Sequence, residues 1–215
     1  MKIGICTIEK RLDNYTKDLV NILKESCIDI KLFVDYDRKG HSWNYRRMMT
    51  EMLENAKQDE KILLCMDDVI TIPEWKEYLD WLVFNSKTGI NVLFNRKRWH
   101  FKQSNLDRGF SNAVHKGSYY DQAVCFVNQQ TLPKKIDSFF NLNKNKTEYM
   151  KRRGKHWDIV ILDTLKYYKI EYTIATPSLF EHVGEKSTLG HSIGKAFNYI
   201  GNNSRKNKNY IHART

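Results

Sequence analysis

Short apolar segments alternate with amphipathic segments along most of the 215 residues, and this alternation constrains the fold more than any other feature. Six apolar runs have the length and the side chains typical of strands: 2–7, 29–35, 61–67, 90–95, 121–128 and 171–176. Four segments repeat apolar residues at helical spacing: 14–26, 42–57, 73–85 and 155–168. A strand–helix–strand order predicts parallel strands joined by right-handed crossovers. We therefore expect an α/β fold with a Rossmann-like, mostly parallel sheet flanked by helices.

The strand and helix pattern extends over residues 1–200, whereas residues 201–215 are polar and basic. We expect a single domain over the first range and a flexible tail over the second. No apolar run approaches the roughly 20 residues that a membrane-spanning helix needs, so no membrane span is expected. The amino-terminal segment has no secretory pattern, which favours a cytoplasmic location.

The four cysteines are scattered, with no CxxC spacing. Cys6, Cys65 and Cys125 lie inside apolar, strand-like runs. Buried, reduced thiols are therefore expected, and the spacing argues against a zinc site.

The formal net charge is +11, and the basic residues gather in the segments 95–102, 134–156 and 204–215. Three such clusters favour a polyanionic partner. On charge alone, that partner could be nucleic acid, anionic lipid or a cell-wall polymer.

Neither of the two glycine-rich phosphate-binding patterns, GxGxxG and GxxxxGK[ST], occurs in the chain. Their absence excludes the Rossmann dinucleotide site and the P-loop. If the chain binds a nucleotide, its phosphates need another counter-charge, for which a divalent cation is the usual choice.

Two adjacent carboxylates, Asp67 and Asp68, stand at the end of the apolar run at 61–67, and a helix begun by Pro73 follows. Neighbouring residues at a strand end point in different directions, so one carboxylate can face a metal ion while the other faces a sugar hydroxyl. The alternative is that both only cap the next segment. Asp35, at the end of the second strand, competes for the metal role, but its position favours contact with a nucleoside.

Four segments of the chain resemble the GT-A-fold glycosyltransferases, which use a metal ion and a nucleotide-sugar. They are GICTIEKR (4–11), LLCMDDV (63–69), HWDIVI (156–161) and PSLFEHVGEKSTLG (177–190). The last segment is similar to the closing segment of the N-acetylglucosaminyltransferase IV family, which branches N-glycans, and of related phage DNA glycosyltransferases. The metal motif departs from the family pattern because Met66 stands at its first acidic position.

The resemblance implies a GT-A fold and a set of site residues. Asp68 and His182 would bind Mn²⁺ or Mg²⁺, because His182 follows the last core strand and can return to the same sheet edge. The alternative for His182 is a loop histidine that is hydrogen-bonded locally. The expected contacts to the nucleotide-sugar come from Thr7, Arg11, Asp35, Asp67, Gly184, Lys186 and Ser187.

Transfer of a sugar with inversion needs one base for the acceptor hydroxyl, and Asp158 is the first candidate. It is expected in the first turn of a helix, where backbone N–H groups favour an anion. The competing interpretation is that Asp158 only stabilises that helix. Asp121 is the second candidate for the base, and Trp157 or Trp99 could stack on a flipped base.

The sequence thus predicts a metal-dependent, inverting glycosyltransferase with a UDP-sugar donor as the first choice. Its acceptor is expected to be double-stranded DNA, either at a 5-hydroxymethylpyrimidine such as hydroxymethylcytosine or at a sugar already attached to it. Such an enzyme would be encoded by a bacteriophage and act in the host cell cytoplasm. The first alternative acceptor is a glycan or cell-surface polysaccharide. The second alternative is a non-catalytic, basic nucleic-acid-binding module.

Overall fold

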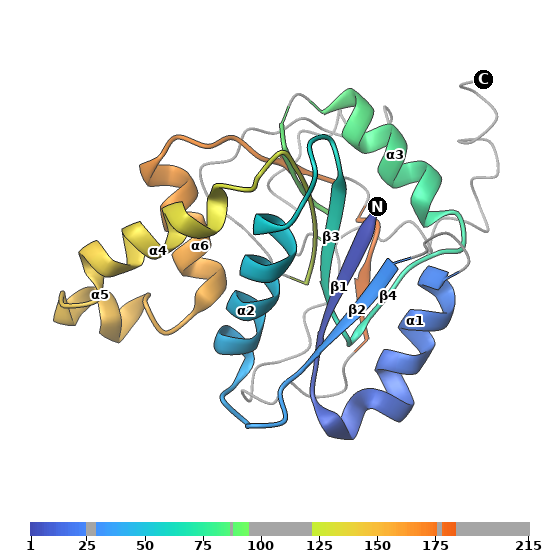
Figure 1. Ribbon diagram of the computed structural model, residues 1–215, viewed down its shortest axis with the longest axis horizontal. Coiled ribbons are helices and arrows are strands. Elements are labelled where there is room, and N and C mark those ends of the chain that lie inside the picture. The colour runs from blue at the N-terminus through green and yellow to red at the C-terminus, as the bar shows by residue number, and fades with distance from the viewer. Residues whose placement is uncertain (25–28, 87, 95–121, 176–177, 184–215) are drawn as a thin grey trace.

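The computed structural model describes residues 1–24, 29–86, 88–94, 122–175 and 178–183. Its centre is a six-stranded sheet with the strand order β2-β1-β3-β6-β5-β7 (Figure 1). The strands are β1 (Lys2–Thr7), β2 (Asp29–Val34), β3 (Lys61–Met66), β5 (Ile90–Val92), β6 (Ala123–Val127) and β7 (Thr173–Ile174). β6 runs antiparallel to both of its neighbours, and the other pairs in this sheet are parallel.

Each of the six runs predicted as strands contains one strand of this sheet. The expected single α/β domain with a mostly parallel sheet is therefore confirmed. Residues 201–215 lie outside the described residues, so the division between a domain at 1–200 and a tail stays a prediction. No helix within the described ranges has the length and apolar character needed to cross a membrane.

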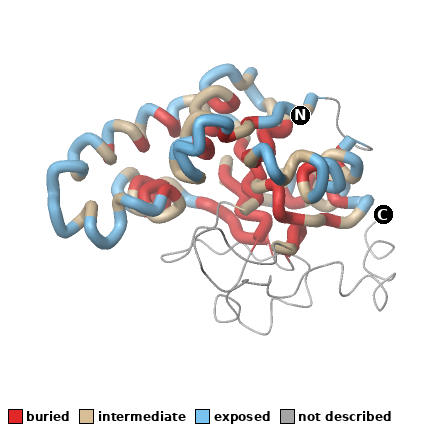
Figure 2. The backbone as a smooth tube through the Cα atoms, turned by 90° about the horizontal axis from the view of Figure 1, so that it is seen from below, coloured by how far each residue is buried: buried red, intermediate tan, exposed pale blue. Residues whose placement is uncertain are grey.

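Helices cover both faces of the sheet. They are α1 (Lys17–Lys24), α2 (His41–Glu54), α3 (Trp75–Asn85), α4 (Leu132–Asn143), α5 (Thr147–Arg152) and α6 (Trp157–Tyr167). α1 and α3 pack on one face, while α2, α4 and α6 pack on the other (Figure 1). Figure 2 shows the strands buried between these layers and the outer sides of the helices exposed.

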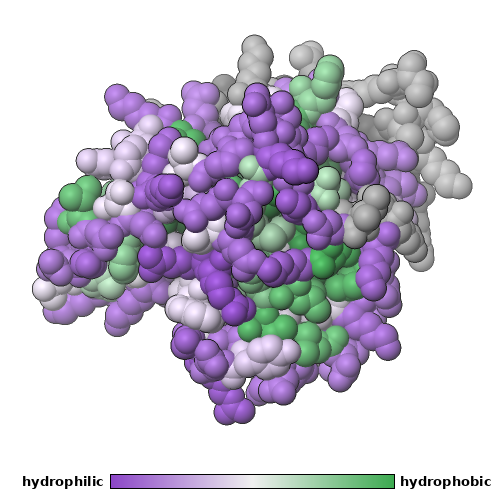
Figure 3. All heavy atoms as spheres, in the orientation of Figure 1, coloured by the Kyte–Doolittle hydropathy of each residue, from purple (hydrophilic) through white to green (hydrophobic). Residues whose placement is uncertain are grey.

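The helices α4 and α5 were not predicted, because the segment that contains them stood out only as a basic cluster. Within α4, however, Ile136 and Phe139 are buried at helical spacing among polar residues. The lysines of this segment occupy the solvent side of an amphipathic helix. In the view of Figure 3, hydrophilic side chains cover most of the surface over α2, α4 and α5.

The core is close-packed against both faces of β1. A Cβ added to Gly4 would lie 3.0 Å from Met48 Cγ and 3.0 Å from Leu64 Cδ2, so the glycine lets α2 approach the sheet closely. Cys6, Cys65 and Cys125 are buried, as expected from the sequence, and none of them forms a disulfide with another described residue. Cys27 lies outside the described residues.

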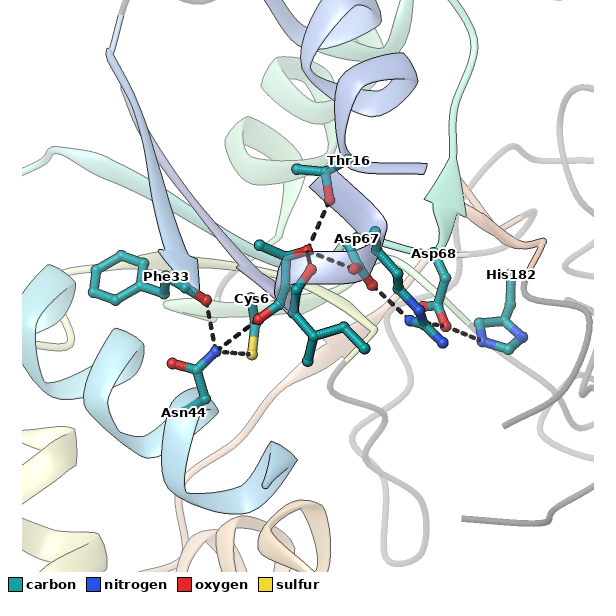
Figure 4. Close-up of polar contacts among 10 residues, drawn as sticks. Cys6, Thr16, Phe33, Asn44, Asp67, Asp68 and His182 are labelled. Carbon is teal, nitrogen blue, oxygen red and sulfur yellow. Dashed lines mark hydrogen bonds and ion pairs between the residues drawn. The ribbon is translucent and has the colours of Figure 1, made fainter. Parts of the chain in front are cut away.

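The buried side chain of Asn44 ties α2 to the carboxyl ends of β1 and β2 (Figure 4). Its Nδ2 donates to Phe33 O at 2.6 Å and to Thr7 O at 3.3 Å, and its Oδ1 accepts a hydrogen bond from Arg47 Nη2 at 2.8 Å. A buried amide is stable only when its donors and acceptor are satisfied. Asn44 therefore fixes the sheet edge at which β1 and β2 end.

Asn44→Ala should destabilise the fold by about 1–3 kcal/mol, because it leaves buried hydrogen-bonding groups without a partner. Urea unfolding followed by circular dichroism measures this loss. The matched control is Asn55→Ala, at the exposed end of α2, which should change stability by less than about 0.5 kcal/mol. Equal unfolding midpoints for the two variants would contradict the role assigned to Asn44.

A second, smaller sheet joins β4 (Val69–Ile70) to β8 (Glu181–His182) in antiparallel pairing. It was not predicted, because two-residue strands leave no periodic signal. Val69 pairs with His182, and Val183 N donates to Asp68 O at 2.9 Å. This pairing brings the last described segment of the chain beside the residues that follow β3.

Candidate functional site

The site begins where β1 and β3 end at the same edge of the sheet (Figure 4). Thr7 is the last residue of β1, and Asp67 and Asp68 follow β3 directly. All three residues are buried, with Asp67 1% and Asp68 7% exposed. Thr7 Oγ1 donates to Asp67 Oδ2 at 2.6 Å, so the parallel pairing of β1 and β3 places the first carboxylate against β1.

Thr16 belongs to the site, although sequence reasoning did not single it out. It ends the second of two irregular helical turns that follow β1, η1 (Glu9–Arg11) and η2 (Leu12–Thr16). Its hydroxyl lies 2.7 Å from Thr7 Oγ1. Because the proton of Thr7 is directed to Asp67, the hydroxyl of Thr16 donates to Thr7. The segment 14–26 had only a helical pattern, and nothing in it distinguished this threonine.

Arg11 bridges the two carboxylates. Its Nη1 donates to Asp67 Oδ1 at 2.8 Å and to Asp68 Oδ2 at 3.0 Å. Burial acts to lower the pKa of Arg11, but the adjacent charges of Asp67 and Asp68 outweigh it and raise that pKa above its ordinary value. In this structure Arg11 offsets part of the negative charge of the acidic pair, and its expected contact with a nucleotide stays a prediction.

His182 reaches the same pair from the far end of the described chain (Figure 4). Its Nε2 lies 3.2 Å from Asp68 Oδ2. The pairing of β4 with β8 sets this approach, since Val69 stands opposite His182. The structure thus brings together Asp68 and His182; what they bind stays a prediction.

The two carboxylates differ in their affinity for protons. Burial raises the pKa of Asp67, and its contacts with Thr7 and Arg11 offset this only in part. Burial acts in the same direction on Asp68, but the hydrogen bond and charge of His182, together with the charge of Arg11, bring the pKa of Asp68 below its ordinary value. The anionic form, which binds a cation, is therefore favoured more strongly at Asp68 than at Asp67.

The residues fit a divalent cation in part. Neighbouring ligands around an octahedral ion with bonds of about 2.0–2.1 Å lie roughly 3 Å apart, and Asp68 Oδ2 and His182 Nε2 are 3.2 Å apart. The described residues contain no group of three or more His, Cys, Asp or Glu side chains that could hold a metal ion. The pair could thus fill two ligand positions, with phosphate oxygens and water in the others.

The carboxylate of Asp35 has a structural role in the connection between β2 and α2. Its Oδ1 accepts the N–H of Lys39 at 2.9 Å, and its Oδ2 accepts the N–H of Gly40 at 2.7 Å. Gly40, with φ of 93°, lies directly before α2. Contact between Asp35 and a nucleoside stays a prediction, and it would have to use the remaining lone pairs of these two oxygens.

Asp158 lies in the first turn of α6, as expected, and this end of α6 packs beside the amino end of α2. Ser42 Oγ donates to Lys155 O at 3.4 Å, and the guanidinium of Arg46 lies 5.4 Å from the centre of the Trp157 ring. Trp157 is only 6% exposed, so its expected role as a stacking surface is wrong, and it packs in the core instead.

Within the described part of the chain, the carboxylates of Asp67 and Asp68 make hydrogen bonds and ion pairs with Thr7, Arg11 and His182. Asp158 is not one of them. Several other residues named from the sequence lie outside the described residues: Trp99, Asp121, Gly184, Lys186 and Ser187.

The sequence matches no protein-family model and no curated protein. Among solved structures, the chain is similar to a glycosyltransferase involved in glycosylation of the major capsid of PBCV-1, with 15% identity and a TM-score of 0.49 over 85% of this chain and 94% of that one. It is also similar to the galactosyltransferase LgtC, with 12% identity and a TM-score of 0.45 over 81% and 73% of the two chains.

A third similar structure is a putative glucose-1-phosphate thymidylyltransferase from Bacillus anthracis, with 12% identity and a TM-score of 0.42 over 87% and 72% of the two chains. These similarities concern the fold alone.

Proposed function

We propose that the chain is a metal-dependent, inverting glycosyltransferase that uses a nucleoside diphosphate sugar, with UDP as the first choice of nucleotide. The observation that carries this proposal is the meeting of Asp68 and His182, at 3.2 Å, where β1 and β3 end. In open α/β sheets, ligands bind at the carboxyl ends of the strands. A buried carboxylate and an imidazole at that edge, beside a guanidinium, suit a cation together with a diphosphate.

Asp68 and His182 are the residues that would hold Mn²⁺ or Mg²⁺. When bound, the ion supplies Lewis-acid stabilisation to the leaving diphosphate. Asp67 is held by Thr7 and Arg11 and would contact the donor beside Asp68. Further contacts to the donor are proposed from Asp35, Gly184, Lys186 and Ser187.

Asp158 is the proposed base, with Asp121 as the second candidate. A carboxylate in the first turn of a helix is favoured as an anion by the nearby N–H groups. Its task would be to take the proton of the acceptor hydroxyl as that oxygen attacks the anomeric carbon.

The acceptor proposed here is a hydroxyl on modified double-stranded DNA, either on a 5-hydroxymethylpyrimidine or on a sugar already attached to it, in a phage-encoded pathway. The net charge of +11 supports this choice, because lysines and arginines bind phosphates. Incubating the protein with labelled UDP-sugars and hydroxymethylcytosine DNA should label that DNA but not an unmodified duplex. If a glycan acceptor is labelled and hydroxymethylcytosine DNA is not, the proposed DNA acceptor is wrong and the alternative acceptor, a glycan, takes its place.

The donor site can be tested by thermal unfolding. UDP with Mn²⁺, at about a hundredfold excess over Kd, should raise Tm by about 5–10 °C, because the ligand binds only the folded chain. The controls are UDP with EDTA and Mn²⁺ alone, both of which should give much smaller shifts. If UDP, GDP and other nucleoside diphosphates leave Tm unchanged in the presence of Mn²⁺, the proposed function is wrong.

A further inference from the structure

Arg11 contacts the carboxylate of Asp68, to which the proposed cation would bind. Its Nη1 is 3.0 Å from Asp68 Oδ2, the same oxygen that lies 3.2 Å from His182 Nε2. Two cations that contact the same carboxylate oxygen lie close enough together to repel each other strongly. Arg11 and a divalent ion therefore compete for Asp68.

The structure also shows why a counter-charge is needed at this position. Asp67 and Asp68 are adjacent, buried carboxylates, and two like charges removed from water destabilise one another. A single nitrogen of Arg11 serves both carboxylates, at 2.8 and 3.0 Å. The guanidinium thus offsets part of the charge of this pair in the chain without ligands.

The contact of Arg11 with the two carboxylates leaves its other N–H groups able to bind a further partner. A guanidinium has five N–H donors, and Arg11 uses only Nη1 here. Within the described residues, its Nε and Nη2 groups have no hydrogen-bond partner, although the ring of Tyr15 lies 5.8 Å from the guanidinium. The side chain is 17% exposed and comes from the short turn η1 rather than from a long helix or a strand.

From this geometry we infer that Arg11 is an exchangeable counter-ion. It holds Asp67 and Asp68 in the free chain, releases Asp68 when a divalent cation binds, and donates its hydrogen bonds to the diphosphate of the incoming nucleotide. This inference rests on the proposed function, since it requires a diphosphate beside the cation. It follows that the cation and the nucleotide each increase the affinity of the chain for the other, because the nucleotide gives Arg11 a new partner.

The test is titration of Mn²⁺ binding by electron paramagnetic resonance of the free ion, with and without UDP. Without UDP, Arg11→Gln should bind Mn²⁺ about tenfold more tightly than the unaltered chain, because the competing cation is gone. UDP should increase the Mn²⁺ affinity of the unaltered chain at least about tenfold, but that of Arg11→Gln less than about threefold.

Two further variants complete the test. Arg11→Lys keeps the charge and should keep the weak, nucleotide-dependent Mn²⁺ binding of the unaltered chain. Arg46→Gln removes one positive charge from a surface pair with Asp137 and should leave Mn²⁺ binding unchanged. Melting followed by circular dichroism confirms that each variant is folded.

The outcomes separate the inference from the proposed function. Suppose that UDP strengthens Mn²⁺ binding to the unaltered chain, but that without UDP Arg11→Gln binds Mn²⁺ no more tightly than the unaltered chain does. The proposed exchange of partners by Arg11 is then wrong, whereas the proposed donor site is still supported. If neither the unaltered chain nor any variant binds Mn²⁺, with or without UDP, the proposed function fails and the inference fails with it.

Discussion

Asp68→Ala is expected to abolish Mn²⁺-dependent nucleotide binding, with a loss of UDP affinity of at least about 100-fold in the presence of Mn²⁺. Asp68 is the carboxylate whose pKa is lowered, and its Oδ2 is the atom that His182 and Arg11 approach. Alanine removes one of the two proposed ligands, and a single imidazole cannot retain a hard cation. Isothermal titration of UDP, with Mn²⁺ and with EDTA, measures the loss.

A matched control is Asp59→Asn, at the opposite edge of the sheet, where β3 begins. Asp59 has a φ of 60° and exchanges hydrogen bonds with Asn128, both of which asparagine tolerates. This control should bind UDP as the unaltered chain does. Unchanged Mn²⁺-dependent UDP binding in folded Asp68→Ala would remove Asp68 from the metal site and leave the proposed donor site without its main support.

The sequence predicted the strands well because their signal is local. The run at 61–67 is mostly apolar, and Asp67 and Asp68 stand at its end, so the strand and the candidate site could be located together. The direction of β6 could not be predicted, because a strand buried on both faces looks the same in either orientation. Only the long-range pairing with β3 and β5 determines it.

The sequence named Asp68 and His182 as residues of the candidate site, but it could not predict the contacts that these residues make. The meeting of Asp68 with His182 depends on the β4–β8 pairing, for which two-residue strands give no periodic pattern. The resemblance to glycosyltransferases still placed both residues at one edge. Thr16 could not be found, because its contribution is a single hydroxyl contact with Thr7, nine residues earlier in the chain.

Arg11 illustrates a different limit of the sequence. The resemblance assigned it to the nucleotide, and nothing in the pattern indicated that the guanidinium also has two carboxylates within reach. Ion pairs between residues far apart in the chain arise from tertiary structure. The same residue can therefore serve an anionic ligand and, without that ligand, the protein's own acidic pair.

Asp158→Asn should reduce the rate of sugar transfer by about 10²–10⁴-fold while leaving UDP binding unchanged within about twofold, because asparagine keeps the shape of the side chain but cannot accept a proton. Transfer from labelled UDP-sugar and the Tm shift with UDP and Mn²⁺ measure the two effects separately. The control is Asp163→Asn on the same helix, whose carboxylate pairs with Arg153 at 2.6 and 2.7 Å and has no proposed role in transfer.

The proposed roles of Asp158 and of the acidic pair require the two sites to lie apart. In an in-line displacement, the attacking hydroxyl and the leaving diphosphate lie on opposite sides of the anomeric carbon. A base for the hydroxyl should therefore stand apart from the groups that bind the diphosphate. If Asp158→Asn transfers sugar at the normal rate, the base is another carboxylate, and Asp121 is the next residue to replace.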